Sequence, residues 1–331
     1  MKIIALLPVK NEAWVIEHTL ASLSGFCDVI LVSDQRSTDA SREICRRFPK
    51  VVLLESAVSN REGQLPKQAR WRLLDAARDY EGSNVLWCTD ADELPSPHAA
   101  RAFLQHSRDR LRPGTAVEFR FRNLWASLER YRQDLSAYGP YWKQVVVVDD
   151  RKVDFPRAAD LPPLHEPRIP TSPDVSVLRS DDVPVLHLQW AFWNRNQMKQ
   201  AWYRCIEWLD HRASAADIND FYAITLPEWY VRTETVPADW LEGLTLPNAS
   251  VDAEPSWHEP EILALFDQHG VEFFEPLEIW HVSRLRTEFR RRVGRNPKPD
   301  RSYRAPWPMR ARQFGRRVFH AAGRRLMPGA P

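Results

Sequence analysis

The stretch Asn84–Glu93, NVLWCTDADE, decides the fold because it joins an apolar run to a cluster of acids. Val85–Cys88 is short and entirely apolar, which predicts a buried strand. The acids follow at once and are Asp90, Asp92 and Glu93, after which a Leu-Pro pair ends the strand. Carboxylates crowded at the end of a buried strand repel one another, so we expect a positive group between them. A hard divalent cation, which takes oxygen ligands, is the first candidate.

Before this stretch, strand patterns alternate with helix patterns. The patterns predict strands at residues 3–8, 29–32 and 51–54 and helices at residues 13–23, 40–48 and 65–79. Such alternation predicts an α/β fold with a mixed, mostly parallel sheet and helices on both faces. Ligands of such sheets bind outside the carboxyl ends of the strands. Polar loops fall at three of those ends, at residues 10–12, 34–39 and 90–93, and predict a site there.

Three motifs in order resemble a known family. They are VKNEAWVIEHTLASL at residues 9–23, SDQRSTDAS at residues 33–41 and CTDADELPSP at residues 88–97. Together they are similar to family 2 glycosyltransferases of the GT-A fold, over residues 1–125. The resemblance implies a GT-A sheet, a nucleotide-diphosphate sugar as donor, and Mn²⁺ or Mg²⁺ as cofactor. It also implies that transfer inverts the configuration of the sugar.

The resemblance also implies roles for single residues. Asp34 would accept a hydrogen bond from the base, Asp90 would lie near the ribose and the metal, and Asp92 would bind the metal. Arg36 stands where many members carry a smaller residue, and an arginine there could face a diphosphate. Asp39 is open to reading as a helix cap, and Lys67 and Arg70 of helix 65–79 as part of a solvated face. The donor-nucleotide residues are Pro8, Asn11, Glu12, Asp34, Arg36, Lys67, Arg70 and Asp90.

The chemistry of such a donor explains why carboxylates and a metal belong together. The sugar leaves behind a diphosphate, whose negative charge must be neutralised in the transition state. A divalent metal held by carboxylates does this as a Lewis acid. The acceptor hydroxyl must lose its proton during an inverting attack, and a nearby carboxylate can take it.

Beyond residue 93 the pattern predicts further elements with less regularity. Residues 160–182 are rich in proline and acids, which predicts a long loop over the sheet, a common form of active-site lid. A strand at residues 184–190 then carries His187, and residues 194–209 form an amphipathic helix. This order is similar to bacterial family members that build surface polysaccharide or lipooligosaccharide cores.

That second resemblance implies that His187 is a further metal ligand and that Glu166 approaches the acceptor hydroxyl as the catalytic base. Glu166 and Asp92 are therefore the predicted catalytic residues. The plain alternatives are a structural strand histidine and a surface carboxylate. Other carboxylates open to the role of base are Asp134, Asp160 and Glu93.

Charge is distributed unevenly along the 331 residues, although the net charge is only +2. Residues 284–331 carry 15 Lys and Arg against 2 acids, and the rest carries 31 against 42. A basic tail indicates contact with anions, and residues 309–327 can be drawn as a basic amphipathic helix on a membrane surface. A solvated tail without structure is the alternative. We expect a glycosyltransferase domain at residues 1–210, an appended subdomain at 211–283 and a basic tail at 284–331.

The remaining composition bounds the location and the other functions. No apolar run approaches the length of a membrane span, and the four cysteines form no CxxC pair, so we expect reduced thiols and a cytoplasmic protein, peripheral at the inner face of the plasma membrane. No motif for binding nucleic acid accompanies the basic tail. A sugar nucleotidyltransferase would need a glycine-rich loop where this chain has Val9–Glu12. A non-catalytic relative that binds nucleotide sugars is the other alternative.

Overall fold

A computed structural model describes residues 1–55, 65–134, 139–155, 167–211, 213–223 and 231–300. The chain divides into two compact units, each described here by itself. The first unit comprises residues 1–196 and 229–255, and the second comprises residues 197–228 and 256–331. The predicted domain boundaries after residues 210 and 283 stay predictions.

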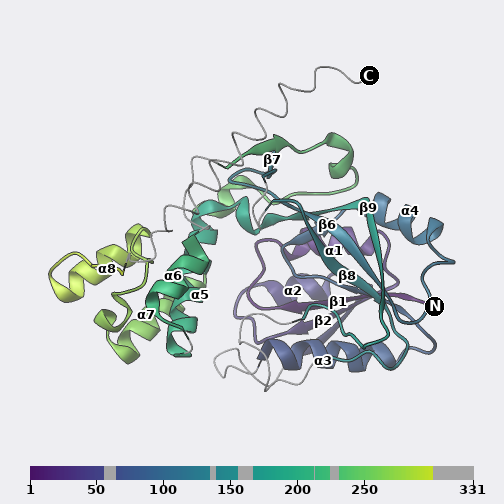
Figure 1. Cartoon of the computed structure of the whole chain (residues 1–331), viewed down its shortest axis with the longest axis horizontal. Coiled ribbons are helices and arrows are strands. Elements are labelled where there is room, and N and C mark those ends of the chain that lie inside the picture. Colours follow the sequence, from purple (N-terminus) through teal and green to yellow (C-terminus); the bar gives the residue numbers. More distant parts are fainter. Residues whose placement is uncertain (56–64, 135–138, 156–166, 212, 224–230, 301–331) are drawn as a thin grey trace. The chain divides into compact units, whose positions relative to one another are not determined.

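The first unit is built on an eight-stranded sheet of order β3-β2-β1-β4-β8-β6-β9-β5 (Figure 1). The pairs from β3 to β4 are parallel, as is β6 with β9, whereas β8 and β5 run antiparallel to their neighbours. The prediction of a mixed, mostly parallel α/β sheet is confirmed, and it is the sheet that the GT-A resemblance implied. The strands are β1 (Ile3–Val9), β2 (Val29–Asp34), β3 (Val51–Glu55), β4 (Val85–Cys88), β5 (Glu93–Pro95), β6 (Thr115–Asn123), β8 (Tyr141–Val148) and β9 (Ser176–His187).

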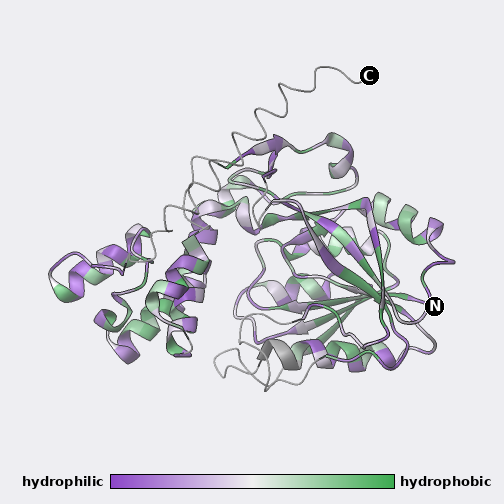
Figure 2. Cartoon of the chain, in the orientation of Figure 1, coloured by the Kyte–Doolittle hydropathy of each residue, from purple (hydrophilic) through white to green (hydrophobic). Residues whose placement is uncertain are grey.

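Helices cover both faces of this sheet, as predicted. Alternate residues of β1 enter two different apolar clusters, Ala5 and Leu7 on one face and Ile4 and Leu6 on the other. Helices α1 (Ile16–Ser24), α2 (Ser41–Arg46) and α4 (Pro97–His106) pack into the first cluster, and α3 (Leu65–Arg78) packs into the second. Figure 1 shows α3 and α2 on opposite sides of the strands, and Figure 2 shows the central strands to be hydrophobic, as strands covered on both faces require.

Two short strands complete the first unit, β7 (Arg130–Arg132) and β10 (Thr233–Thr235), which pair in antiparallel fashion. Short 3₁₀ turns follow at η3 (Leu188–Trp190), η5 (Ala238–Leu241) and η6 (Ala249–Ala253).

The predicted loop at residues 160–182 is wrong over its last third, because β9 begins at Ser176. The outer half of β9 is polar and largely exposed, so the sequence shows no apolar alternation there that would predict a strand. Backbone pairing with β6, from Thr115↔Ser176 to Phe119↔Ser180, holds it in the sheet instead. The three-residue strand β5 was not predicted either, and it pairs with β9 alone.

The second unit is helical. It contains α5 (Trp193–Leu209) from Gln197 onward, together with α6 (Ala215–Tyr222), α7 (His258–His269), the 3₁₀ turn η7 (Val271–Phe274) and α8 (Ser283–Val293). Their apolar side chains, among them Cys205, Phe266 and Phe289, form a separate cluster. Gly270 follows α7 with a φ of 81°, a backbone conformation that favours glycine and ends the helix.

Two of the composition arguments are tested by the structure. All four cysteines are buried and unbridged, so the prediction of reduced thiols that fill the core is confirmed. None of the helices in the described ranges is both long and apolar enough to cross a membrane.

Candidate active site

The three predicted polar loops meet at one edge of the sheet because their strands are neighbours. Val9 at the end of β1 pairs with Asp34 at the end of β2. On the other side of β1, Leu6 pairs with Cys88, and its carbonyl accepts a hydrogen bond from Thr89 N at 3.2 Å. The loops that follow β1, β2 and β4 therefore begin side by side.

Asn11 braces the first two loops against each other. Its backbone N donates to Ser37 Oγ at 2.9 Å, and its side-chain Oδ1 accepts from Thr38 N at 2.7 Å. Asn11 and Arg36 both have left-handed backbones, with φ of 54° and 59°. Asparagine tolerates this conformation, but arginine adopts it at a cost in conformational energy. Strained residues of this kind gather at binding sites, and Arg36 is exposed there.

Asp34 is buried beneath the second loop and is weakly satisfied. Its two oxygens accept from Ser37 N at 3.3 and 3.2 Å, and Arg42 Nε lies 3.9 Å away. These distances are at or beyond the long end for hydrogen bonds to oxygen. An N–H donor at a shorter distance from the carboxylate would therefore bind it better. The side chain is only 2% exposed, which makes such a donor valuable.

The other residues of these loops have structural partners. Asp39 accepts from Ala13 N at 3.0 Å and from Ser41 N at 2.9 Å, so it links the first loop to the start of α2, although the N-cap residue of that helix is Ala40. Glu12 Oε2 accepts from Trp14 Nε1 at 2.6 Å. Pro8 lies half-buried near the end of β1.

Asp90 lies between two arginines. Its Oδ1 accepts from Arg70 at 2.9 Å and its Oδ2 accepts from Arg168 at 2.7 Å. Burial opposes ionisation of Asp90, but the charges of Arg168 and Arg70 outweigh it and hold the pKa of this carboxyl well below its usual value. Arg70 therefore contacts the acidic motif and does not lie on a solvated helix face. The side chain of Lys67 lies outside the described residues.

Glu93 is the most buried acid of the motif, at 1% exposed. It accepts from Thr89 Oγ1 at 3.1 Å and from Asp90 N at 2.9 Å, which fixes the turn of the motif. Arg168 donates to both of its oxygens, and Lys143 Nζ lies 3.5 Å from Oε1. These partners make Glu93 a structural anchor and leave it poorly suited to be the catalytic base.

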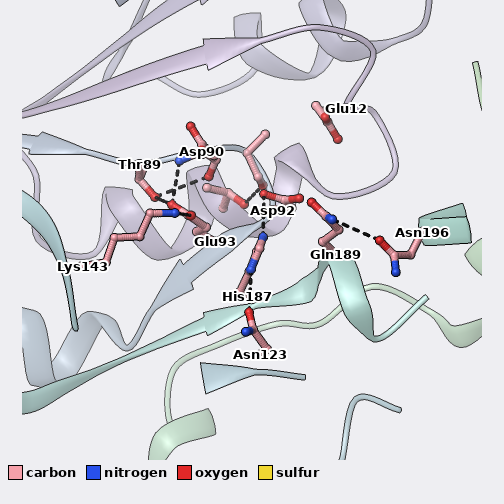
Figure 3. Close-up of polar contacts among 12 residues, drawn as sticks. Glu12, Thr89, Asp90, Asp92, Glu93, Asn123, Lys143, His187, Gln189 and Asn196 are labelled. Carbon is pink, nitrogen blue, oxygen red and sulfur yellow. Dashed lines mark hydrogen bonds and ion pairs between the residues drawn. The ribbon is translucent and has the colours of Figure 1, made fainter. Parts of the chain in front are cut away.

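Asp92 and His187 face each other across the same edge (Figure 3). His187 Nε2 lies 3.7 Å from Asp92 Oδ1, and Nδ1 lies 2.8 Å from Asn123 Oδ1. Because that amide oxygen only accepts, Nδ1 donates to it, and Nε2 is the ring nitrogen that faces Asp92. Strand pairing sets this arrangement, since His187 stands opposite both Glu93 and Asn123.

This pair fits a divalent metal ion by its donor chemistry. A carboxylate oxygen and an imidazole nitrogen point at one space, and Asn123 orients the ring as outer-shell partners of metal-bound histidines do. Within the described ranges, no group of three or more His, Cys, Asp or Glu is gathered closely enough to hold an ion. The predicted set of Asp90, Asp92 and His187 stays a prediction.

The sequence patterns missed three residues of the site: Asn123, Lys143 and Arg168. Lys143 had one signal, because it is a charged residue in a strand that is otherwise mostly apolar. Arg168 had no such signal, because it lies in a predicted loop and is 75 residues from Glu93 in the sequence. Two acids named as alternative bases differ in outcome: Asp134 pairs with Arg132 at 2.7 Å, and Asp160 lies outside the described residues, as does Glu166.

Comparison with known proteins gives partial likenesses. No family model matches the sequence, and no curated protein matches it. A structure of TarS from S. aureus matches with 15% identity and a TM-score of 0.38, covering 68% of this chain and 43% of that one. A shorter TarS structure, of residues 1–349, matches with 13% identity and a TM-score of 0.38, covering 88% of this chain and 85% of that one.

A third structure is glucosyl-3-phosphoglycerate synthase from Mycobacterium tuberculosis, in complex with Mn²⁺, uridine diphosphate and glucosyl-3-phosphoglycerate. It matches with 25% identity and a TM-score of 0.27, covering 37% of this chain and 44% of that one. The chain thus spans less than half of the full TarS structure and of the synthase. This chain is therefore similar to each of these proteins over part of its length.

Proposed function

We propose that this chain is a metal-dependent glycosyltransferase that moves a sugar from a nucleotide-diphosphate donor to a hydroxyl group of an acceptor, with inversion. The observation that carries the proposal is the facing pair of Asp92 and His187, set at the sheet edge where the polar loops of β1 and β2 also end. A pair of side chains suited to a metal ion, beside polar loops, fits what a diphosphate leaving group requires.

The base of the donor would lie over the loops after β1 and β2. Asp34 is buried, negatively charged and weakly satisfied, so it favours a base that presents an N–H group. The backbone N–H groups of Asn11 and Glu12 donate to Ser37 Oγ and Ser41 Oγ, and these hydrogen bonds fix the first loop against the segment that follows β2. Arg36 is exposed beside it and able to reach an anionic group of the nucleotide.

Asp92 and His187 would hold the metal ion, and Asn123 would keep the His187 ring in its metal-binding tautomer. When bound, Mn²⁺ or Mg²⁺ supplies a Lewis acid next to the diphosphate. Arg70, Arg168 and Lys143 add positive charge at the same edge. Lys143 and Arg168 also lie over the ring of Phe121, at 4.8 and 5.5 Å from its centre.

Transfer forms a bond between the acceptor oxygen and the anomeric carbon while the bond from that carbon to the diphosphate oxygen breaks. The bonding electrons leave with the diphosphate, and the acceptor proton passes to a carboxylate. Glu166 stays our candidate for this base, because Glu93 is held by Arg168 and Asp134 by Arg132. By the resemblance of its motifs, the acceptor is a saccharide or a lipid-linked saccharide of bacterial surface glycans.

The test compares Asp92→Asn with Asp181→Asn, whose carboxylate pairs with Arg120 and Arg122 at the surface and is 46% exposed. Thermal shifts are measured with uridine, guanosine, cytidine and thymidine diphosphate sugars, each with Mn²⁺ or with EDTA. We expect one nucleotide to raise the melting temperature by more in Mn²⁺ than in EDTA, which defines a Mn²⁺-dependent shift. Asp92→Asn should abolish that shift and the release of nucleoside diphosphate, and Asp181→Asn should keep both.

Full activity of Asp92→Asn in EDTA would overturn the proposal. Binding of a nucleotide sugar by the native protein without any release of the nucleoside diphosphate would indicate the non-catalytic alternative.

We also propose that the basic tail places the protein at an anionic membrane surface, such as the inner face of the plasma membrane. Four arginines of residues 284–300 already pair with acids of their own unit, as Arg291 and Arg292 do with Glu288. Residues 301–331 lie outside the described ranges, and their sequence has eight arginines and no acid. We expect these eight arginines to make the contact with the anionic membrane surface. Cosedimentation with phosphatidylglycerol vesicles, lost on truncation after residue 300, tests this, and equal binding by both forms would refute it.

A further inference from the structure

We propose that Asp90 serves Arg70 and Arg168 rather than the metal ion, and that Arg168 is a further donor-site residue that neutralises the departing diphosphate. This inference rests on the proposed function, since it states how the same site handles its leaving group. It changes the role expected for Asp90, which the motif alone places near the metal.

The contacts of Asp90 and Asp92 differ in kind. Each oxygen of Asp90 accepts a hydrogen bond from a different guanidinium, at 2.9 Å from Arg70 and 2.7 Å from Arg168. A divalent ion bound to this carboxylate would lie close to two positive charges. Asp92 lies instead 3.7 Å from Nε2 of His187, an imidazole nitrogen that can bind the same ion. The structure therefore favours Asp92 and His187 as the protein ligands.

Arg168 is held at this edge by several hydrogen bonds. It is 8% exposed, Glu93 accepts from both of its terminal nitrogens, and Asp90 accepts from one of them, Nη2, at 2.7 Å. Arg70 NH1 also donates to its backbone oxygen at 3.2 Å, which ties the two arginines together. The Nε–H of Arg168 is buried and has no hydrogen-bond partner among the residues that the structure describes. A buried guanidinium with a donor to spare is suited to bind a phosphate oxygen.

The charges of the cluster support the same assignment. Three carboxylates, of Asp90, Asp92 and Glu93, stand against three cations, of Arg70, Lys143 and Arg168. Because the cluster is balanced by itself, a divalent ion and a diphosphate would add charges that offset each other. The inference is that the ion and the nucleotide bind as a pair, and that the arginines retain some hold on a diphosphate without the ion.

The first experiment separates the two aspartates by their effect on the ion. Binding of Mn²⁺ is followed by electron paramagnetic resonance, alone and with saturating uridine or guanosine diphosphate, in Asp90→Asn and Asp92→Asn. We expect Asp92→Asn to weaken Mn²⁺ binding by tenfold or more, about the loss seen when the support of a metal site is removed, and Asp90→Asn to change it by less than about threefold. Equal losses in the two variants would overturn the assignment of Asp90.

The second experiment tests Arg168 in EDTA, where no ion contributes. Calorimetry compares uridine and guanosine diphosphate binding to the native protein, Arg168→Gln, Arg168→Lys and the surface control Arg179→Gln, whose partner is Glu118. We expect about a tenfold loss with Arg168→Gln, a smaller loss with Arg168→Lys, and none with the control. Circular dichroism confirms that each variant is folded. Binding unchanged in both Arg168 variants would overturn this half.

Failure of the proposed function has a different signature. If the native protein binds neither nucleoside diphosphate with or without Mn²⁺, the proposed function falls and the role of Arg168 falls with it. Mn²⁺ binding without nucleotide still decides between Asp90 and Asp92, because that measurement needs no donor.

Discussion

Replacing Glu93 by glutamine should destabilise the first unit more than any surface change of the same kind. The substitution keeps the volume of the side chain and removes its charge. Glu93 is 1% exposed and receives both terminal nitrogens of Arg168, with Lys143 Nζ at 3.5 Å. After the change, Arg168 keeps only Asp90 as an ionised partner. The cluster then carries an unbalanced positive charge in a buried position.

The expected magnitude follows from that geometry. Removing one partner of a buried ion pair costs about 3–5 kcal/mol. Glutamine keeps one acceptor oxygen for Thr89 Oγ1 or Asp90 N, so we expect the low end, about 3 kcal/mol of unfolding free energy. For a unit of this size, that loss lowers the melting temperature by about 6–12 °C.

Thermal unfolding followed by circular dichroism measures this loss, and Glu118→Gln is the matched control. Glu118 pairs with Arg179 at 2.6 Å, but Arg179 is 63% exposed, so this pair should contribute less than about 1 kcal/mol. A melting temperature for Glu93→Gln within about 2 °C of the control would refute the role of Glu93 as anchor.

Three further predictions concern single residues. The Arg291 and Arg292 guanidiniums lower the pKa of Glu288 to about 2, so Glu288→Gln should destabilise the second unit at pH 7, and urea titrations should show its difference from the native protein shrinking from pH 5 toward pH 2. Burial and then Arg204 lower the pKa of His281 to about 3, so the folded state takes up its proton later than the unfolded state, and stability should fall as the pH drops from about 6.5 toward 3. His281→Gln should flatten that decline, and an unchanged slope would contradict it. A Cβ on Gly25 would lie 2.7 Å from Pro97 Cβ. Gly25→Ala should therefore lower the unfolding free energy by about 1–3 kcal/mol through overpacking. A melting temperature equal to the native value would show that Pro97 shifts to accept the methyl group at no cost.

The elements near the start of the chain could be predicted because their signal is local. Apolar runs bounded by polar loops gave β1, β2, β3 and β4 to within two residues. Helix α1 begins at Ile16, three residues later than expected, because residues 13–15 form a turn, with Val15 N bonded to Glu12 O at 3.0 Å. The outer half of β9 escaped prediction, since its pairing with a distant strand outweighs its polar composition.

The site divides in the same way. Asp34 ends β2, and Asp90 and Asp92 follow β4 closely, which is where a sheet of this kind places its ligands, so these positions were foreseen. The partners of these acids were not foreseen. Arg168 binds Glu93 and Asp90 although it lies 75 and 78 residues from them in the sequence, and no local pattern predicts so distant a contact. Glu93 was undervalued because only these partners show that it is an anchor.

The short strand β5 has a consequence for the order of folding. It carries Glu93, it is three residues long, and its pairing partner β9 lies almost a hundred positions further along the chain. Closing so long a loop is costly in entropy and slow, whereas the parallel core of β1, β2 and β4 needs only the first 88 residues. As the chain leaves the ribosome, the loops after β1 and β2 can therefore form early. The acidic motif acquires Arg168 and His187 only after residue 187 has been made, so this part of the candidate site is completed later.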